Sequence, residues 1–118
     1  MNIEYFRNYC LSKKGVTEHL PFDEFTLVFK VMNKMFALTR ITAFESINLK
    51  CDPEKAILLR ENYSGIIPGY HMSKTHWNTV STDGSVPEKL LIKLIDESYS
   101  LIVNKLTKKE KAELSLLY

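Results

Sequence analysis

Apolar and polar residues alternate along three stretches in the first half of the chain, which is the pattern of strands that bury one face. The stretches are residues 26–31, 34–40 and 46–51. Met32 and Asn33 connect the first two and predict a two-residue hairpin turn, because asparagine tolerates a positive φ. We therefore expect an antiparallel meander with one packed face and one partly wet face.

The same alternation assigns the basic residues of this meander to faces. Lys30 and Lys50 fall on the wet face. The face of Lys34 depends on the hairpin register, since a slip of one residue moves every side chain of a strand to the other side.

Helical periodicity appears at both ends of this meander. The spacing of apolar residues predicts a short helix over 2–13. After the third strand, Asp52 and Pro53 supply an N-cap and a first-turn proline for a helix that runs to about Asn62.

Two capping-box patterns predict the helices of the C-terminal part. Ser85 and Glu88 begin the longest helix, over 87–106, whose apolar stripe should cover the sheet. Thr107 and Glu110 begin a short helix in the tail.

Two further strands are expected before the longest helix. We place them at 66–72 and 77–82, joined by a loop around 73–75, with a hairpin turn at 83–84 after the second. The predicted order is α-β-β-β-α-β-β-α(-α). The fold class is therefore α+β, a two-layer sandwich in which helices cover one face of an antiparallel sheet of about five strands.

Length and composition agree with one domain over 1–118. With 45% hydrophobic and 25% charged residues, the chain has the composition of a soluble globular protein. No apolar run is long enough for a membrane span, and the start lacks the apolar core of a signal peptide, so a cytoplasmic location without membrane contact is expected. Cys10 and Cys51 fit that compartment as free thiols.

Residues 68–80, PGYHMSKTHWNTV, concentrate the chemistry of the chain. His71 and His76 are five positions apart and lack the further ligands of a closed zinc site. Ser73 lies near both histidines but belongs to no nucleophile motif. We therefore expect no metal, no cofactor and no catalytic residues.

A binding surface is the remaining functional reading. The candidate residues combine positive charge with an aromatic side chain, which suits phosphate backbones and bases; they are Lys30, Lys34, Lys50, His71, Lys74, His76 and Trp77. The net charge of +2 favours nucleic-acid binding only if the basic side chains share one surface. The alternative interpretation is purely structural: the same lysines would protect strand edges from pairing, and the tryptophan would anchor the core.

Four segments of the sequence resemble the MmcQ/YjbR family: LPFDEFTLVFKVMNKMFAL, INLKCDPEKAILLRENY, GIIPGYHMSKTHWNTV and DGSVPEKLLIKLIDESYSLIV. The match spans about 15–106 and leaves 107–118 as a C-terminal helical extension. The resemblance implies a CyaY-like or secretion-chaperone-like fold and a "double wing" that binds DNA. It implies no cofactor. Signature positions include Gly69, Trp77 and the pair Ser98-Tyr99.

Three functions follow as expectations. The first is a monomeric, non-enzymatic domain that binds DNA through a basic sheet-and-loop surface. The second is a protein-interaction module, as a chaperone-like fold implies. The third is a small-molecule or enzymatic pocket around His71, Tyr70 and Cys51.

Overall fold

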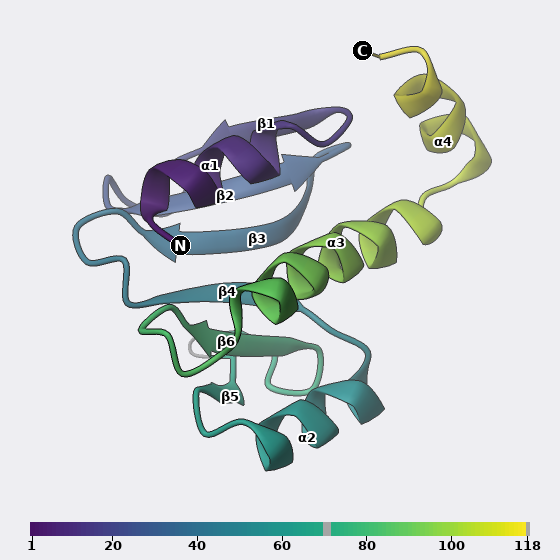
Figure 1. The fold of residues 1–118 in the computed structure, drawn as a ribbon. Helices are drawn as coiled ribbons and strands as arrows, with labels where there is room; N and C mark the ends of the chain where they lie inside the picture. The colour runs from purple at the N-terminus through teal and green to yellow at the C-terminus, as the bar shows by residue number, and fades with distance from the viewer. Residues whose placement is uncertain (70–71, 118) are drawn as a thin grey trace.

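In a computed structural model, which describes residues 1–69 and 72–117, one antiparallel sheet of six strands is combined with four helices (Figure 1). The sheet order is β1-β2-β3-β4-β6-β5. The strands are β1 (Val16–His19), β2 (Thr26–Val31), β3 (Lys34–Arg40), β4 (Ser46–Lys50), β5 (Ile66–Pro68) and β6 (Trp77–Ser81). The helices are α1 (Ile3–Leu11), α2 (Pro53–Asn62), α3 (Glu88–Asn104) and α4 (Lys108–Ser115).

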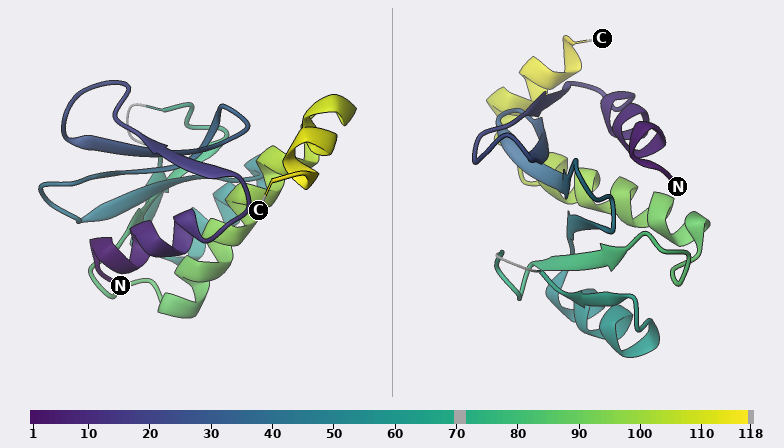
Figure 2. Two further views of the ribbon diagram at one scale, coloured as in Figure 1. Left: turned by 90° about the horizontal axis from the view of Figure 1, so that it is seen from above. Right: turned by 90° about the vertical axis from the view of Figure 1, so that its left-hand side faces the viewer.

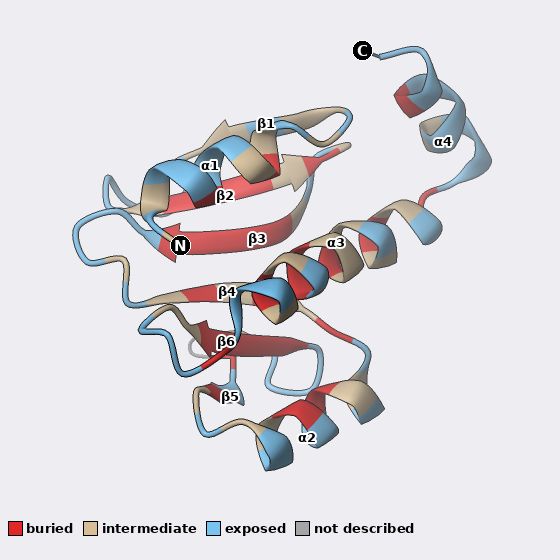
Figure 3. Cartoon of the chain, viewed as in Figure 1, coloured by how far each residue is buried: buried red, intermediate tan, exposed pale blue. Residues whose placement is uncertain are grey.

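The helices α1, α2 and α3 lie on one face of the sheet, which confirms the two-layer α+β fold (Figures 1 and 2). Their apolar side chains meet the inward-facing residues of the strands in one core (Figure 3). Phe29, Phe36 and Ile95 are fully buried there. Burial of such large side chains removes water from apolar surface and is the main driving force for this packing.

The hairpin between β2 and β3 forms as the alternation predicts. Met32 and Asn33 have φ values of 48° and 68°, the two positive angles of a type I′ turn. The pairing then shifts, because Lys30 lies opposite Met35 whereas Phe29 lies opposite Ala37. This β-bulge at residue 36 turns the Phe36 ring toward the helices, where it packs edge-on against Tyr99 of α3.

Ser98 of α3 completes the backbone hydrogen bonds at the end of β3 and β4. Its hydroxyl donates to the carbonyl oxygen of Phe36 (2.5 Å) and accepts from the amide of Lys50 (2.9 Å). Since Ser98 is fully buried, no water replaces these partners. The Ser98-Tyr99 pair of the sequence signature thus fixes α3 to the strand ends.

Strand β1 is absent from the sequence prediction, so the sheet has six described strands instead of about five. The segment Val16–His19 carries one apolar residue and shows no alternation. It forms a strand because its backbone pairs with the edge of β2. An ion pair of 2.5 Å between Arg7 and Glu18 joins α1 to this strand.

The connection from β6 to α3 also differs from the prediction. Residues 83–84 form no hairpin, because the chain passes from β6 directly into α3. The capping box expected at Ser85 is wrong. Its amide donates to the side chain of Asp83 (2.9 Å), and Pro87 occupies the N-cap without any side-chain cap.

Helix α4 is fixed to the hairpin between β2 and β3. Thr107 and Glu110 form the predicted capping box. The Nζ of Lys34 also donates to Glu110 (2.8 Å), and Leu114 in the last turn of α4 is buried. Because Lys34 and the Thr107 amide both bind its carboxylate, the pKa of Glu110 is lowered from 4.5 to about 2.

We expect acid to release α4 before the rest of the fold. A carboxyl group with a lowered pKa contributes stability above its ordinary pKa of 4.5, and that contribution disappears as the pH falls toward about 2. Amide chemical shifts of α4 should therefore move between these pH values. In Glu110→Gln, which cannot titrate, the α4 amides should show no transition in this interval. Identical transitions in both proteins would assign the effect to another group.

Candidate functional site

The sheet register brings the sequence-predicted lysines of the meander to one end of the molecule. Lys30 lies opposite Met35 beside the hairpin turn, and Lys34 is the first residue of β3. Lys50 ends β4 and lies opposite Trp77, the first residue of β6. Antiparallel pairing places all these strand ends together.

The loop before β6 lies at the same end. The carbonyl oxygen of His76 accepts from the amide of Cys51 (2.8 Å), so the loop packs beside the end of β4. Arg60 of α2 binds the carbonyl oxygen of Lys74 and donates through Nε to Asn78 (2.7 Å). These contacts hold Lys74 and His76 at the surface, where both side chains are exposed.

The C-terminal end of α3 adds further lysines. Lys105 follows the last turn of α3 and interacts electrostatically with Lys50. Lys108 and Lys109 begin α4. We call the combined surface the lysine end; it consists of Lys30, Lys50, Lys74, Lys105, Lys108 and Lys109.

The charges of the lysine end are not compensated by ion pairs. Within residues 1–69 and 72–117, none of its six lysines lies within 4.0 Å of a carboxylate oxygen. Lys34 differs, because Glu110 neutralises it. Burial, and secondarily the repulsion from Lys105, lower the pKa of Lys50. An anion at this surface would therefore relieve an unfavourable accumulation of positive charge.

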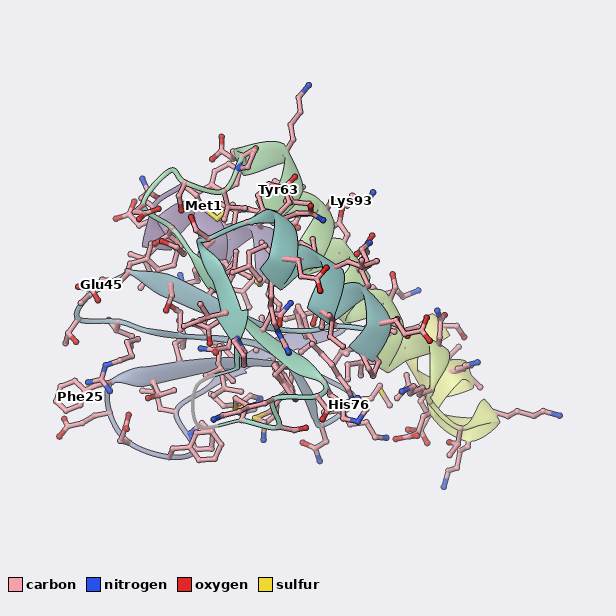
Figure 4. The ribbon with its side chains drawn as sticks, turned by 90° about the horizontal axis from the view of Figure 1, so that it is seen from below. Met1, Phe25, Glu45, Tyr63, His76 and Lys93 are labelled. Atoms are coloured by element: carbon pink, nitrogen blue, oxygen red, sulfur yellow. The ribbon has the colours of Figure 1, made fainter. Side chains whose placement is uncertain are left out.

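Acidic residues collect at the opposite end of the sheet. They lie just before β2, just before β4 and just after β6; they are Asp23, Glu24, Glu45 and Asp83. In Figure 4, His76 lies on the side of α4, whereas Glu45 and Phe25 lie at the far side. Arg40 is the basic strand residue at that end. At the strand ends and in the loops next to them, lysines thus lie toward one end of the sheet and these four carboxylates toward the other.

Not every predicted site residue is accessible. Trp77 is 8% exposed and packs with Val28 and Leu38 on the sheet face opposite the helices. Its ring is therefore unavailable for stacking on a base. His71, like Tyr70, lies outside the described residues.

Sequence reasoning missed the three lysines contributed by the end of α3 and the start of α4. Lys108, Lys109 and Lys111 lie in the C-terminal extension beyond the family match, and no local pattern links them to the sheet. The length of α3 was predicted, but its position against the sheet was not. Ser98 contacts β3 and β4 near their ends, so the last turns of α3 extend past the sheet and place Lys105 there.

The sheet face away from the helices carries a hollow of about 790 Å³. A hydrogen bond of 2.6 Å between Thr79 and Asn48 lies within it. Phe22 and Ile67, 64% and 49% exposed, contribute to its wall together with Met72. This hollow is apolar at its rim and lies nearer the acidic end.

The described part of the chain offers no group of three His, Cys, Asp or Glu side chains arranged to hold a metal ion. Cys10 and Cys51 are both buried and free, and burial raises the pKa of each thiol. None of the helices in residues 1–69 and 72–117 is long and apolar enough to cross a membrane.

Comparison with known proteins matches residues 11–101 to the family model YjbR. The Escherichia coli K12 protein YjbR is 34% identical over 112 residues, which cover 94% of this chain and 95% of that protein. The Bacillus subtilis protein YyaQ is 36% identical over 75 residues, or 64% of this chain and 63% of the relative. These names state no activity.

Two solved structures have the same fold. A crystal structure of the Deinococcus radiodurans protein DR2400, a DUF419 domain, has a TM-score of 0.91 at 43% identity and covers 98% of this chain and 88% of its own. A Pseudomonas syringae protein gives a TM-score of 0.73 at 32% identity, covering 86% of this chain and 98% of its own. The match to the Deinococcus radiodurans protein covers 98% of this chain and therefore includes most of α4, so this helix is not confined to the present chain.

Proposed function

The chain belongs to the YjbR family, and from this premise we propose that it binds nucleic acid, with duplex DNA as the expected partner, through phosphate contacts at the lysine end. The observation that carries this proposal is the separation of charge between the two ends of the sheet. A net charge of +2 spread evenly would attract a polyanion weakly. The same charge sorted onto one surface creates a local positive potential.

The geometry of the lysine end suits a phosphate backbone. Lys30 and Lys50 are separated by one strand, β3, which corresponds to about 10 Å across the sheet. That separation lets each ammonium group reach a different phosphate. Lys74 and Lys108 extend the surface on either side, and the exposed imidazole of His76 adds a hydrogen-bonding group.

The chemistry of the surface favours backbone contacts over base recognition. Lysine ammonium groups act as point charges, whereas bidentate reading of guanine requires arginine or a well-placed lysine in a groove. Arg60, the arginine that reaches this end, donates to the carbonyl oxygen of Lys74 and to Asn78 and is therefore already engaged. The expected binding is therefore largely independent of sequence, with a dissociation constant of roughly 1–100 µM in moderate salt.

An amide chemical-shift titration with a short duplex tests the proposal. We expect saturable shifts at Lys30, at residues 49–51 and at residues 73–77 and 105–109, because these amides adjoin the contacting side chains. Residues 23–24 and 83–84, at the acidic end, are the internal control and should not shift. A titration without saturable shifts, or with shifts only at the acidic end, would contradict the proposal.

Protein binding is a second candidate, favoured by the exposed Phe22 and Ile67 around the hollow on the open sheet face. The acidic side chains Asp23 and Glu45 also contribute to that hollow. Arg40 lines the hollow as well, so the exposed apolar side chains, and not a one-sided charge, are what favour a protein partner here. A blank DNA titration would make this surface the leading candidate.

A further inference from the structure

The hollow on the open sheet face has a floor and two walls. Its floor is a row of paired strand residues, in which Leu38 lies opposite Asn48 and Asn48 lies opposite Thr79. Phe22 belongs to the connection between β1 and β2 at one edge of the sheet, and Ile67 belongs to β5 at the other edge. The volume of about 790 Å³ lies within the range of about 300–1,000 Å³ that is typical of ligand sites.

Asn48 presents hydrogen-bond donors at the centre of this floor. Its Oδ1 accepts from the hydroxyl of Thr79 (2.6 Å), which fixes the orientation of the amide group. Within residues 1–69 and 72–117, its Nδ2 group makes no hydrogen bond, although it carries two N–H donors. A ligand atom that accepts a hydrogen bond is therefore favoured at Asn48.

The same hollow contains charges of both signs. Asp23 accepts from the amides of Phe25 (2.8 Å) and Thr26 (2.7 Å) through Oδ1, which leaves Oδ2 to accept from a ligand. Glu45 is a second carboxylate in the lining, and Arg40 is a cation that offsets part of this negative charge. Because an ion of either sign would meet a like charge here, an uncharged group that both donates and accepts suits the hollow better.

The exposed apolar side chains of the walls suit the flat faces of such a group. Phe22 is 64% exposed and Ile67 is 49% exposed. Stacking on accessible aromatic rings is how many proteins hold unpaired nucleobases. The sequence favoured Trp77 for this contact, but the ring of Trp77 is buried, and Phe22 supplies an accessible ring on the same face of the sheet.

The lysine end adjoins the hollow on this face. Lys50 lies opposite Trp77, whose ring packs on the open face, so the side chain of Lys50 projects to the same side. Asn48 and Lys50 are two residues apart on β4, which corresponds to about 7 Å along the strand. A phosphate at Lys50 and a nucleobase in the hollow can thus belong to one short stretch of nucleic acid.

We propose that the hollow on the open face binds an unpaired nucleobase, whose face contacts Phe22 and whose edge accepts a hydrogen bond from Asn48. A nucleobase is uncharged, has flat faces that stack and carries donors and acceptors along its edge. The phosphates stay at the lysine end, because Asp23 and Glu45 repel them from the hollow. The inference rests on the proposed nucleic-acid binding and specifies its partner as a duplex with an unpaired segment.

Two duplexes that differ only in their overhangs test the inference. Both have the same base pairs and the same number of phosphates, but one ends in three unpaired deoxyadenosines and the other in three abasic nucleotides. We expect the adenine overhang to bind at least about fivefold more tightly, because each stacked base adds affinity without adding charge. Fluorescence anisotropy at low salt measures both affinities.

Three variants identify the contacting residues through the ratio of the two affinities, which cancels any change in phosphate binding. Phe22→Ala should bring the ratio close to 1. Phe25→Ala is the matched control, because Phe25 is 42% exposed in the same loop and lies outside the lining, so the ratio should not change. Asn48→Asp keeps the acceptor for Thr79 but replaces the two N–H donors, and it should lower the ratio at least about twofold.

The possible failures of this experiment are distinguishable. Equal affinity of the wild-type protein for the two duplexes would overturn nucleobase binding and leave phosphate binding at the lysine end intact. An unchanged ratio in Phe22→Ala would also overturn the inference, because the nucleobase would then bind elsewhere. If neither duplex binds, phosphate contact at the lysine end is wrong and this inference is wrong with it.

Discussion

Replacement of Ser98 by alanine is expected to lower the free energy of unfolding by about 2–4 kcal/mol, although it removes a single oxygen atom. The hydroxyl satisfies two buried backbone groups, the Phe36 carbonyl and the Lys50 amide. Alanine leaves both without a partner, and each unsatisfied group costs about 1–3 kcal/mol. Urea unfolding followed by circular dichroism measures the change.

Ser100→Ala is the matched control for this substitution. Ser100 lies two residues further along α3 and is exposed, so its replacement should change stability by no more than about 0.5 kcal/mol. Equal effects of the two substitutions would show that Ser98 contributes only helix propensity. An intact stability in Ser98→Ala would contradict the role of its hydroxyl.

Gly69→Ala is expected to cost about 2–4 kcal/mol, because the added methyl group has no space. A Cβ atom at this position would lie 2.7 Å from the Cβ of Trp77 and 2.9 Å from its carbonyl oxygen. The neighbour is backbone, so relief requires breaking the hydrogen bond of 2.8 Å from the Gly69 amide to that oxygen. Thermal unfolding measures the loss of stability, and tryptophan fluorescence reports the displacement of Trp77.

Gly84→Ala distinguishes a lack of space from backbone strain. Nothing lies within 4 Å of a Cβ at Gly84, but its φ of +95° disfavours alanine. It should cost about 1–2 kcal/mol and leave the Trp77 fluorescence unchanged. If Gly69→Ala behaves in the same way, the close packing against Trp77 is not what requires glycine.

The elements that sequence predicted well are those whose signals are local. The hairpin follows from the alternation and from Met32 and Asn33, and α2 follows from Asp52 and Pro53. Strand β1 has no such pattern, since it exists only as a partner of the edge of β2. The failed capping box at Ser85 shows the same limitation, because Asp83 competes for its amide.

The candidate surface was only partly predictable for a related reason. The alternation places Lys30 and Lys50 on strands, but their meeting with Lys105 depends on how far α3 extends past the sheet. The neutralisation of Lys34 requires α4 to fold back onto the hairpin. Trp77, which composition favours as a stacking group, is buried because the open face has its own small core.

The central functional claim is that the position of the positive charges, and not their number, determines nucleic-acid binding. The matched double variants Lys105→Gln/Lys108→Gln and Lys89→Gln/Lys93→Gln each remove two exposed lysines. The first pair belongs to the lysine end. The second lies on the first turns of α3, away from it; Lys93 and His76 are well separated in Figure 4.

The decisive measurement is the affinity of wild type and both variants for a short duplex over a series of salt concentrations. We predict that Lys105→Gln/Lys108→Gln weakens binding by about fivefold or more at low salt and reduces the slope of log affinity against log salt by up to about 1.8, which corresponds to two phosphate contacts. Lys89→Gln/Lys93→Gln should stay close to wild type. Equal weakening by both variants, or an affinity that does not change with salt, would contradict the account.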